Sequence, residues 1–217
     1  MATGSDKVVA LRRLLDERHP TAQPKSPRFI PTGVPALDEI LGDGLRTGVL
    51  IELVSEAAST GNQTALGSLI LATRLARQRV AVIDAASAFD IEGFDADAVA
   101  HVVWVRCSTL SECWRAADLV ARDPNYAVTV IDVRGQPLRA LMRTRDSTWT
   151  RLQRAAEQAE TAVLIQSDSA IVPNAAFRFT FSMPLKPETL TAPRREVIRL
   201  LAPGLQRRRT RPLEVTA

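Results

Sequence analysis

Five short apolar segments, separated by helix-like segments, constrain the fold of this 217-residue chain most strongly. The segments predicted as strands are residues 49–54, 80–84, 102–106, 127–132 and 162–166, and helical patterns are found at 35–41, 64–78, 110–122 and 148–160. Strands that alternate with helices pair in parallel, because each helix carries the chain back across the sheet. Continuous apolar runs indicate strands buried on both faces. The sequence therefore predicts an α/β fold with a mainly parallel, twisted sheet covered by helices on both faces.

Prolines and composition divide the chain into three predicted parts. Residues 1–31 form an amino-terminal helix and a proline-rich linker, residues 32–185 form the core domain, and residues 186–217 form a terminal strand and a basic tail. Two further β-like runs, 177–183 and 197–201, are expected to extend one edge of the sheet as antiparallel strands.

Cysteine and histidine usage argues against disulfide and metal chemistry. Cys107 and Cys113 are too few for a disulfide framework, which favours a reducing cytoplasm. A zinc site would need both cysteines together with His19 and His101, so we expect no metal. Polar residues interrupt the longest uncharged stretch, 57–73, so we expect no membrane span, and we expect no secretory signal. The expected location is the cytoplasm, in association with the nucleoid when DNA or partners are bound.

The amino-terminal segment 7–18 has the pattern of an amphipathic helix. Its apolar stripe consists of Val8, Leu11, Leu14 and Leu15. Four prolines follow between residues 19 and 31 and stop the helix. This helix either packs on its own domain or docks in the groove of a partner protein.

The positive charge of the chain is concentrated near its carboxyl end. From residue 194 onward there are seven arginines and two glutamates. We expect the group Arg207, Arg208, Arg209 and Arg211, flanked by Pro203 and Pro212, to form a mobile arm. Such an arm is either attracted to nucleic-acid phosphate or an acidic partner, or only keeps the chain soluble.

A second group of arginines follows the fourth predicted strand. Between residues 134 and 154, Asp146 is the only acid, and the arginines are Arg134, Arg139, Arg143, Arg145, Arg151 and Arg154. This group is either a surface for an anion or acidic partner, or a solvated helix face.

The turn after the first apolar strand has the length of a phosphate-binding loop but lacks its chemistry. Such a loop needs a glycine, four residues, a second glycine, a lysine, and a serine or threonine. Gly61 fits its position, whereas Glu56 replaces the first glycine, Asn62 the lysine and Gln63 the hydroxyl residue, with Thr64 one position late. No lysine lies between residues 26 and 185 to substitute. We therefore expect a relic turn that caps a helix and binds no ATP.

Two predicted strands end in an acid. Asp132 ends the fourth strand, where phosphate-loop enzymes hold magnesium, and Asp84 ends the second. Taken alone, each also fits a helix-capping role.

The residues at 32–38, 41–45, 48, 51–53 and 82–90 together resemble the core of the RecA recombinases. The resemblance covers about residues 29–183. Within that group the chain is most similar to the ImuA proteins, RecA-related companions of an error-prone polymerase, through Leu11-Arg12-Arg13-Leu14-Leu15 and Trp104-Val105-Arg106-Cys107.

This resemblance implies a RecA fold without ATP-driven strand exchange. Ala86 stands where RecA carries the glutamate that activates water, and only residues 167–176 stand where RecA has a long DNA-binding loop. The implied role is that of a non-catalytic accessory protein of SOS-induced translesion DNA synthesis. The implied partners are an ImuB-type homologue of Y-family polymerases, an error-prone replicative-type polymerase and RecA, with weak DNA contact.

Two other functions remain open at the level of sequence. One is an ATP-dependent recombinase, against which the residues of the turn and Ala86 argue. The other is a cell-division inhibitor of the SulA type, whose family also has a shortened RecA-like core. The basic tail and the proline-linked helix favour the polymerase accessory.

Overall fold

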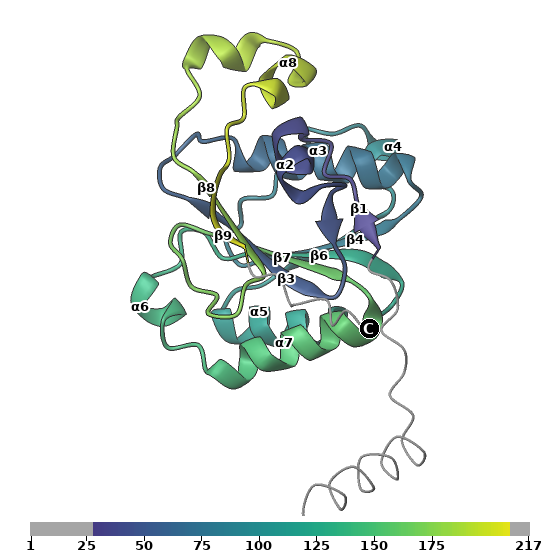
Figure 1. The fold of residues 1–217 in the computed structure, drawn as a ribbon, viewed down its shortest axis with the longest axis vertical. Helices are drawn as coiled ribbons and strands as arrows, with labels where there is room; N and C mark the ends of the chain where they lie inside the picture. Colours follow the sequence, from purple (N-terminus) through teal and green to yellow (C-terminus); the bar gives the residue numbers. More distant parts are fainter. Residues whose placement is uncertain (1–27, 209–217) are drawn as a thin grey trace, which may run out of the picture.

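The structure is a computed structural model that describes residues 28–208, which form a central sheet with helices on both faces (Figure 1). The sheet has seven strands in the spatial order β5-β4-β6-β7-β3-β8-β9. In chain order they are β3 (Val49–Ser55), β4 (Arg79–Asp84), β5 (Val102–Arg106), β6 (Tyr126–Asp132), β7 (Ala162–Ser167), β8 (Phe177–Phe181) and β9 (Gly204–Arg208). Every neighbouring pair is parallel except β8 with β9. The predicted α/β architecture is therefore confirmed.

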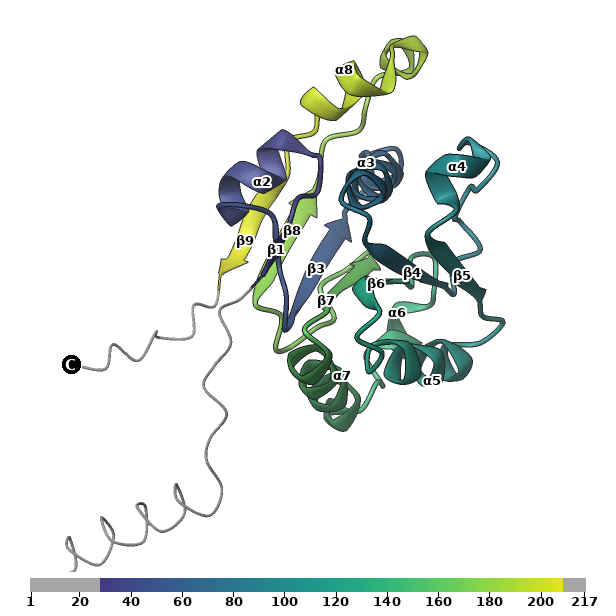
Figure 2. The same ribbon diagram turned by 90° about the vertical axis from the view of Figure 1, so that its right-hand side faces the viewer.

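The helices divide between the two faces of the sheet (Figure 2). One face carries α2 (Pro35–Leu41), α3 (Asn62–Leu75) and α4 (Ala96–Val99), and the other carries α5 (Leu110–Val120), α6 (Leu138–Leu141) and α7 (Asp146–Ala159). A 3-10 turn, η1 (Pro187–Thr191), precedes α8 (Arg194–Arg199), which contacts α2 and α3. Two short strands, β1 (Phe29–Ile30) and β2 (Leu45–Arg46), pair separately in antiparallel fashion.

Local sequence signals set the start of two helices. The Thr109 side chain accepts a hydrogen bond from the Glu112 backbone N–H (3.2 Å), and the Glu112 carboxylate accepts one from the Ser108 N–H (2.8 Å), which forms a capping box at α5. Pro35 occupies the first turn of α2, where its missing N–H costs no hydrogen bond.

Apolar side chains fill both layers of the fold. On β3, Ile51 and Leu53 join the core beneath α2 and α3, whereas Leu50 joins the core beneath α5 and α7. All three side chains are almost fully buried. This dense packing on both sides holds the carboxyl ends of the strands in fixed positions.

Three expectations at the edges of the core are wrong. β8 extends one edge of the sheet as expected and pairs antiparallel with β9, but it pairs with β3 in parallel rather than antiparallel orientation. The run 197–201 belongs mainly to α8 and not to a strand, because Val197 and Leu201, four residues apart, turn to the same buried side. Phe29–Ile30, expected to end the linker, forms β1.

Among residues 28–208, no helix is long and apolar enough to span a membrane.

Candidate functional site: a polar pocket at the end of β3

An open pocket of about 660 Å³ lies where the chain leaves β3 and enters α3. Because β3 lies between β7 and β8, this loop opens at the interior of the carboxyl edge of the sheet, where parallel α/β folds place their ligands. The lining consists of loop residues 55–64, Ala86 and Ala88 after β4, Arg134 and Gly135 after β6, Asp168 after β7, and Leu185.

The structure brings six of the seven residues of the predicted degenerate nucleotide site together at this pocket. Those that line the pocket are Glu56, Gly61, Asn62, Gln63, Thr64 and Ala86. Asp132 is fully buried and is paired with Arg134, which does line the pocket.

The loop itself is held by the segment that follows β8. The Glu56 N–H donates to the Phe181 carbonyl (3.1 Å), and the Leu185 N–H donates to the Ser59 carbonyl (2.9 Å). Gly61 has φ of 94°, and a Cβ at this position would collide with the Leu201 side chain. Glycine is therefore required here by its backbone conformation and by close packing.

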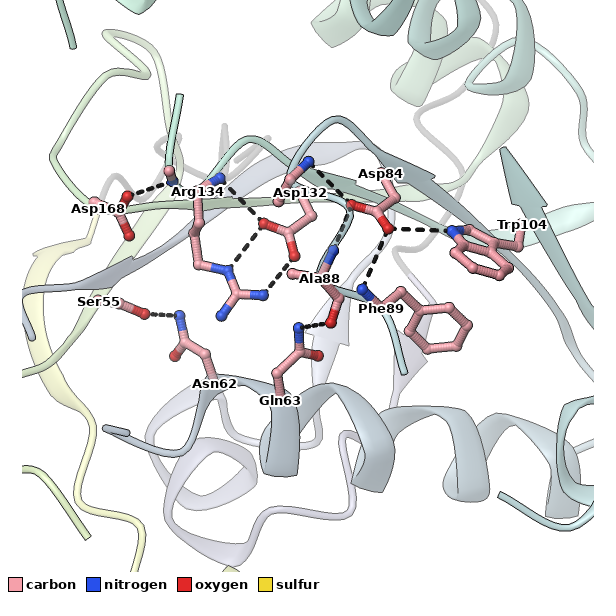
Figure 3. A network of polar contacts seen from close by, with 12 residues as sticks. Ser55, Asn62, Gln63, Asp84, Ala88, Phe89, Trp104, Asp132, Arg134 and Asp168 are labelled. Carbon is pink, nitrogen blue, oxygen red and sulfur yellow. Dashed lines mark hydrogen bonds and ion pairs between the residues drawn. The ribbon is translucent and has the colours of Figure 1, made fainter. Parts of the chain in front are cut away.

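Asn62, which stands at the lysine position, makes a contact inside the protein in place of one to a phosphate. Asn62 is 97% buried, with 3% of its surface exposed, and its side-chain amide donates to the Ser55 hydroxyl at the end of β3 (Figure 3). The side chain carries no charge, so it supplies none of the attraction that a lysine offers to outer phosphates.

Gln63 at the next position links two neighbouring turns. Its Nε2 donates to the Ala88 carbonyl (2.8 Å), which joins the start of α3 to the segment after β4 (Figure 3). Thr64 is half-buried beside it on the pocket wall. α3 begins at Asn62 directly after this turn, but its N-cap residue is Gly61 and makes no side-chain capping hydrogen bond.

Asp132, the acid that ends β6, forms a bidentate ion pair with Arg134. Arg134 Nε lies 2.9 Å from Asp132 Oδ1, and Arg134 Nη2 lies 2.5 Å from Oδ2 (Figure 3). Burial alone lowers the pKa of Arg134, but the hydrogen bonds and charge of Asp132 outweigh it and raise this pKa above its ordinary value. Both oxygens of the carboxylate thus face a permanently charged guanidinium.

The acid that ends β4 organises a loop. Asp84 accepts hydrogen bonds from the backbone N–H groups of Ala86 (3.0 Å), Ala88 (3.3 Å) and Phe89 (3.2 Å), and from the Trp104 indole (3.2 Å). Its carboxylate is fully buried. The segment after Asp84 is a loop and the next helix, α4, begins only at Ala96, so the helix-capping role considered from the sequence is wrong for Asp84. Ala86 offers no side-chain base toward the pocket.

Further contacts fix the segment that carries Arg134. The Gly135 N–H donates to Asp168 Oδ2 (2.6 Å), and Gln136 Nε2 donates to the Ala85 carbonyl (2.6 Å). These contacts tie the turns after β4, β6 and β7 into one polar network around the pocket.

Sequence reasoning missed one contact and one residue of this region. The pairing of Arg134 with Asp132 has a weak signal, since an arginine two residues after an acid at a strand end can turn back onto it. Gln166 of β7, next to Asp132 in the sheet register, is fully buried, and neither of its amide atoms has a partner among the described residues. No local sequence pattern marks that position.

The other predicted sites lie elsewhere. Val8, Leu11, Leu14 and Leu15 fall outside the described residues, as do Arg209 and Arg211. Arg207 and Arg208 belong to β9, so the expectation of a mobile arm is wrong for them: their backbones pair with β8, and Arg207 Nη1 donates to the Pro173 carbonyl (2.8 Å).

Within residues 28–208, no three His, Cys, Asp or Glu side chains gather in a way that could hold a metal ion.

Comparisons with known proteins do not assign this chain to a family. A scan against models of known protein families finds no match to the chain, and a search of curated proteins finds none either.

Proposed function

We propose that this chain is a non-catalytic, RecA-like accessory protein of an error-prone translesion DNA synthesis complex in the SOS response. The resemblance of residues 29–183 to RecA and ImuA proteins carries the assignment to this process. The position of the loop, between an interior parallel strand and a helix, supports a RecA-like core.

The ion pair between Arg134 and Asp132 is the observation that favours a binding role over ATP turnover. A magnesium ion held by Asp132 would have to displace a guanidinium that makes two hydrogen bonds to the buried carboxylate. Removing one partner from such a buried pair costs about 3–5 kcal/mol. The nucleotide would have to supply that energy without a loop lysine.

The compact segment after β7 also supports a role without strand exchange. Glu52 of β3 accepts hydrogen bonds from the N–H groups of Ile171 (2.6 Å) and Val172 (3.1 Å). Arg178 of β8 pairs with the same carboxylate and donates to the Val172 carbonyl (2.7 Å). The segment therefore packs on the sheet where a DNA-binding loop would have to extend from it.

In this proposal the partners are an ImuB-type polymerase homologue, an error-prone replicative-type polymerase and RecA. The stripe Val8, Leu11, Leu14 and Leu15 is the proposed docking element, because its spacing presents one apolar face to a groove. The chain would act in the cytoplasm and join the nucleoid through these partners.

Reconstitution of the complex tests this proposal. The full chain is mixed with the purified polymerase homologue, and co-elution is followed by size-exclusion chromatography with and without Mg·ATP. We expect the same complex in both conditions, its loss in Leu11→Ser/Leu14→Ser, and its retention in the control Arg12→Gln/Arg13→Gln. A complex that forms only with ATP, or no complex at all, would contradict the proposal.

A further inference from the structure

Four arginines that have no ion pair among the described residues lie on α6, on α7 and in the turn between these helices. We define the arginine surface as Arg139, Arg143, Arg145 and Arg154 together with Leu138 and Met142. All six side chains are exposed, and Leu138 and Met142 keep 49% and 65% of their surface accessible. None of these four arginines has an ion pair with another residue of the described chain, whereas their neighbours Arg134 and Arg151 face Asp132 and Asp118.

The same chain carries an acidic surface of nearly matching charge. Residues 90–97 contain four acids and no lysine or arginine. We define the acidic surface as Asp90, Glu92 and Asp95, which are exposed, while Asp97 pairs with Arg74. Ile91 and Phe94 lie half-buried between these acids and pack on the core beneath α3.

The two surfaces lie on opposite faces of the sheet and cannot meet within one molecule. Ile91 and Phe94 pack on the core beneath α2 and α3, whereas Leu141 of α6 belongs to the core beneath α5 and α7. Figures 1 and 2 agree that α4, which follows the acidic surface, and α6 lie on different sides of the strands.

We infer that the arginine surface binds the acidic surface of a second copy of this chain. Arginine is weakly hydrated and pairs with carboxylates in a bidentate way, which makes it a favoured interface residue. Leu138 and Met142 add apolar area between the arginines. No aromatic side chain of the arginine surface offers a platform for nucleic-acid bases, and nearby Trp149 is buried.

This contact joins different surfaces of two identical chains, so it is heterologous. Each added copy presents a free arginine surface at one end and a free acidic surface at the other. Assembly therefore proceeds head to tail beyond a dimer, and it weakens as salt rises because the Debye length falls to about 8 Å at 0.15 M.

Variants that remove charge and keep a polar side chain test each surface. The variants are Arg139→Gln/Arg143→Gln for the arginine surface and Glu92→Gln/Asp95→Asn for the acidic surface. All four side chains are exposed and make no side-chain hydrogen bond or ion pair within residues 28–208, so both variants should fold. The controls with equal charge change are Arg195→Gln/Arg199→Gln and Glu39→Gln/Asp43→Asn, all at exposed positions.

Sedimentation velocity of the full chain over a concentration series at low salt gives the readout. We expect the wild type and both controls to form concentration-dependent oligomers, and each surface variant alone to associate at least about tenfold more weakly. An equimolar mixture of the two surface variants should form a one-to-one dimer and nothing larger, because each molecule retains one intact surface.

Several results would overturn this inference. One is a wild-type protein that stays monomeric at every concentration. This result would overturn the inference also if the monomer binds a single-stranded oligonucleotide through Arg139 and Arg143. Another is association that the arginine variant weakens while the acidic variant does not. A third is a mixture of variants that fails to form the dimer.

Discussion

Arg134 holds Asp132 through two charged hydrogen bonds, 2.9 Å from Nε to Oδ1 and 2.5 Å from Nη2 to Oδ2. Asp132 is fully buried at the end of β6, and the Arg134 side chain is 17% exposed at the pocket wall. The carboxylate that would serve a magnesium ion in a nucleotide-hydrolysing relative of this fold is thus used inside the protein.

Replacing Arg134 alone should be strongly destabilising. Arg134→Ala leaves the Asp132 charge buried without its partner, and we expect a loss of about 3–5 kcal/mol in the free energy of unfolding, measured by urea denaturation. The double variant Asp132→Asn/Arg134→Ala should lose less than the single variant, since no unpaired charge remains. The control Arg154→Ala should stay within about 0.5 kcal/mol of the wild type. Equal losses in Arg134→Ala and Arg154→Ala would show that the ion pair is not formed.

Glu52 should control the order of the segment between β7 and β8. Its Oε2 lies 2.6 Å from Arg178 Nε, and its Oε1 accepts the N–H groups of Ile171 and Val172. Glu52→Gln removes the charge that holds these donors, so amide exchange at both residues should become faster by hydrogen-exchange mass spectrometry. Unchanged exchange in a folded variant would mean that other contacts hold this segment.

Substitutions at Gly61 and Leu201 should have non-additive effects on the free energy of unfolding. Gly61→Ala places a side chain at φ of 94° and against Leu201, for which we expect about 1–3 kcal/mol of destabilisation. In Gly61→Ala/Leu201→Ala the collision is gone, so the double variant should lose less than the sum of the single losses. Simple additivity in thermal or urea unfolding would contradict the contact between loop and α8 segment.

The thiols of Cys107 and Cys113 should be unreactive in the folded protein. Their ionisation should change the free energy of unfolding only at high pH. Burial is the main cause that raises the pKa of both Cys107 and Cys113 above 9.0. Folding therefore favours the protonated thiols, so the free energy of unfolding should be unaffected by them below about pH 8 and should fall as pH rises beyond about 9. A thiol reagent at neutral pH should label both residues only after unfolding. Rapid labelling of the native chain would contradict this burial.

The interior of the sheet could be predicted from the sequence because each strand is a continuous apolar run between helical patterns. The run 80–84, for example, became Arg79–Asp84, and 35–41 became α2 with the same bounds. Such continuous apolar runs are typical of strands that are buried on both faces of a parallel sheet.

The edges could not be predicted, because backbone pairing and long-range contacts decide them. The run 197–201 has the apolar content of a strand, yet only the four-residue spacing of Val197 and Leu201 reflects its helix. Arg207 and Arg208 have the charge of a solvated arm, but their backbone pairs with the edge of β8 as part of β9.

At the candidate site, sequence identified the loop residues and not their contacts. The slots of Glu56, Gly61, Asn62 and Gln63 follow from spacing alone, and all four line the pocket. Asn62 contacts Ser55 seven residues before it, and Arg134 contacts Asp132 two residues before it, so both contacts depend on how the chain turns after β3 and β6, which residue spacing alone does not specify.

Calorimetric titration of the full chain with Mg·ATP tests the central claim most directly. We predict no binding of Mg·ATP in the micromolar range, because Asn62 and Gln63 supply no positive charge. We also predict no phosphate release, because Ala86 supplies no base and both carboxylate oxygens of Asp132 are paired with Arg134. A dissociation constant in the low micromolar range, together with turnover that is lost in Asp132→Ala, would contradict the account.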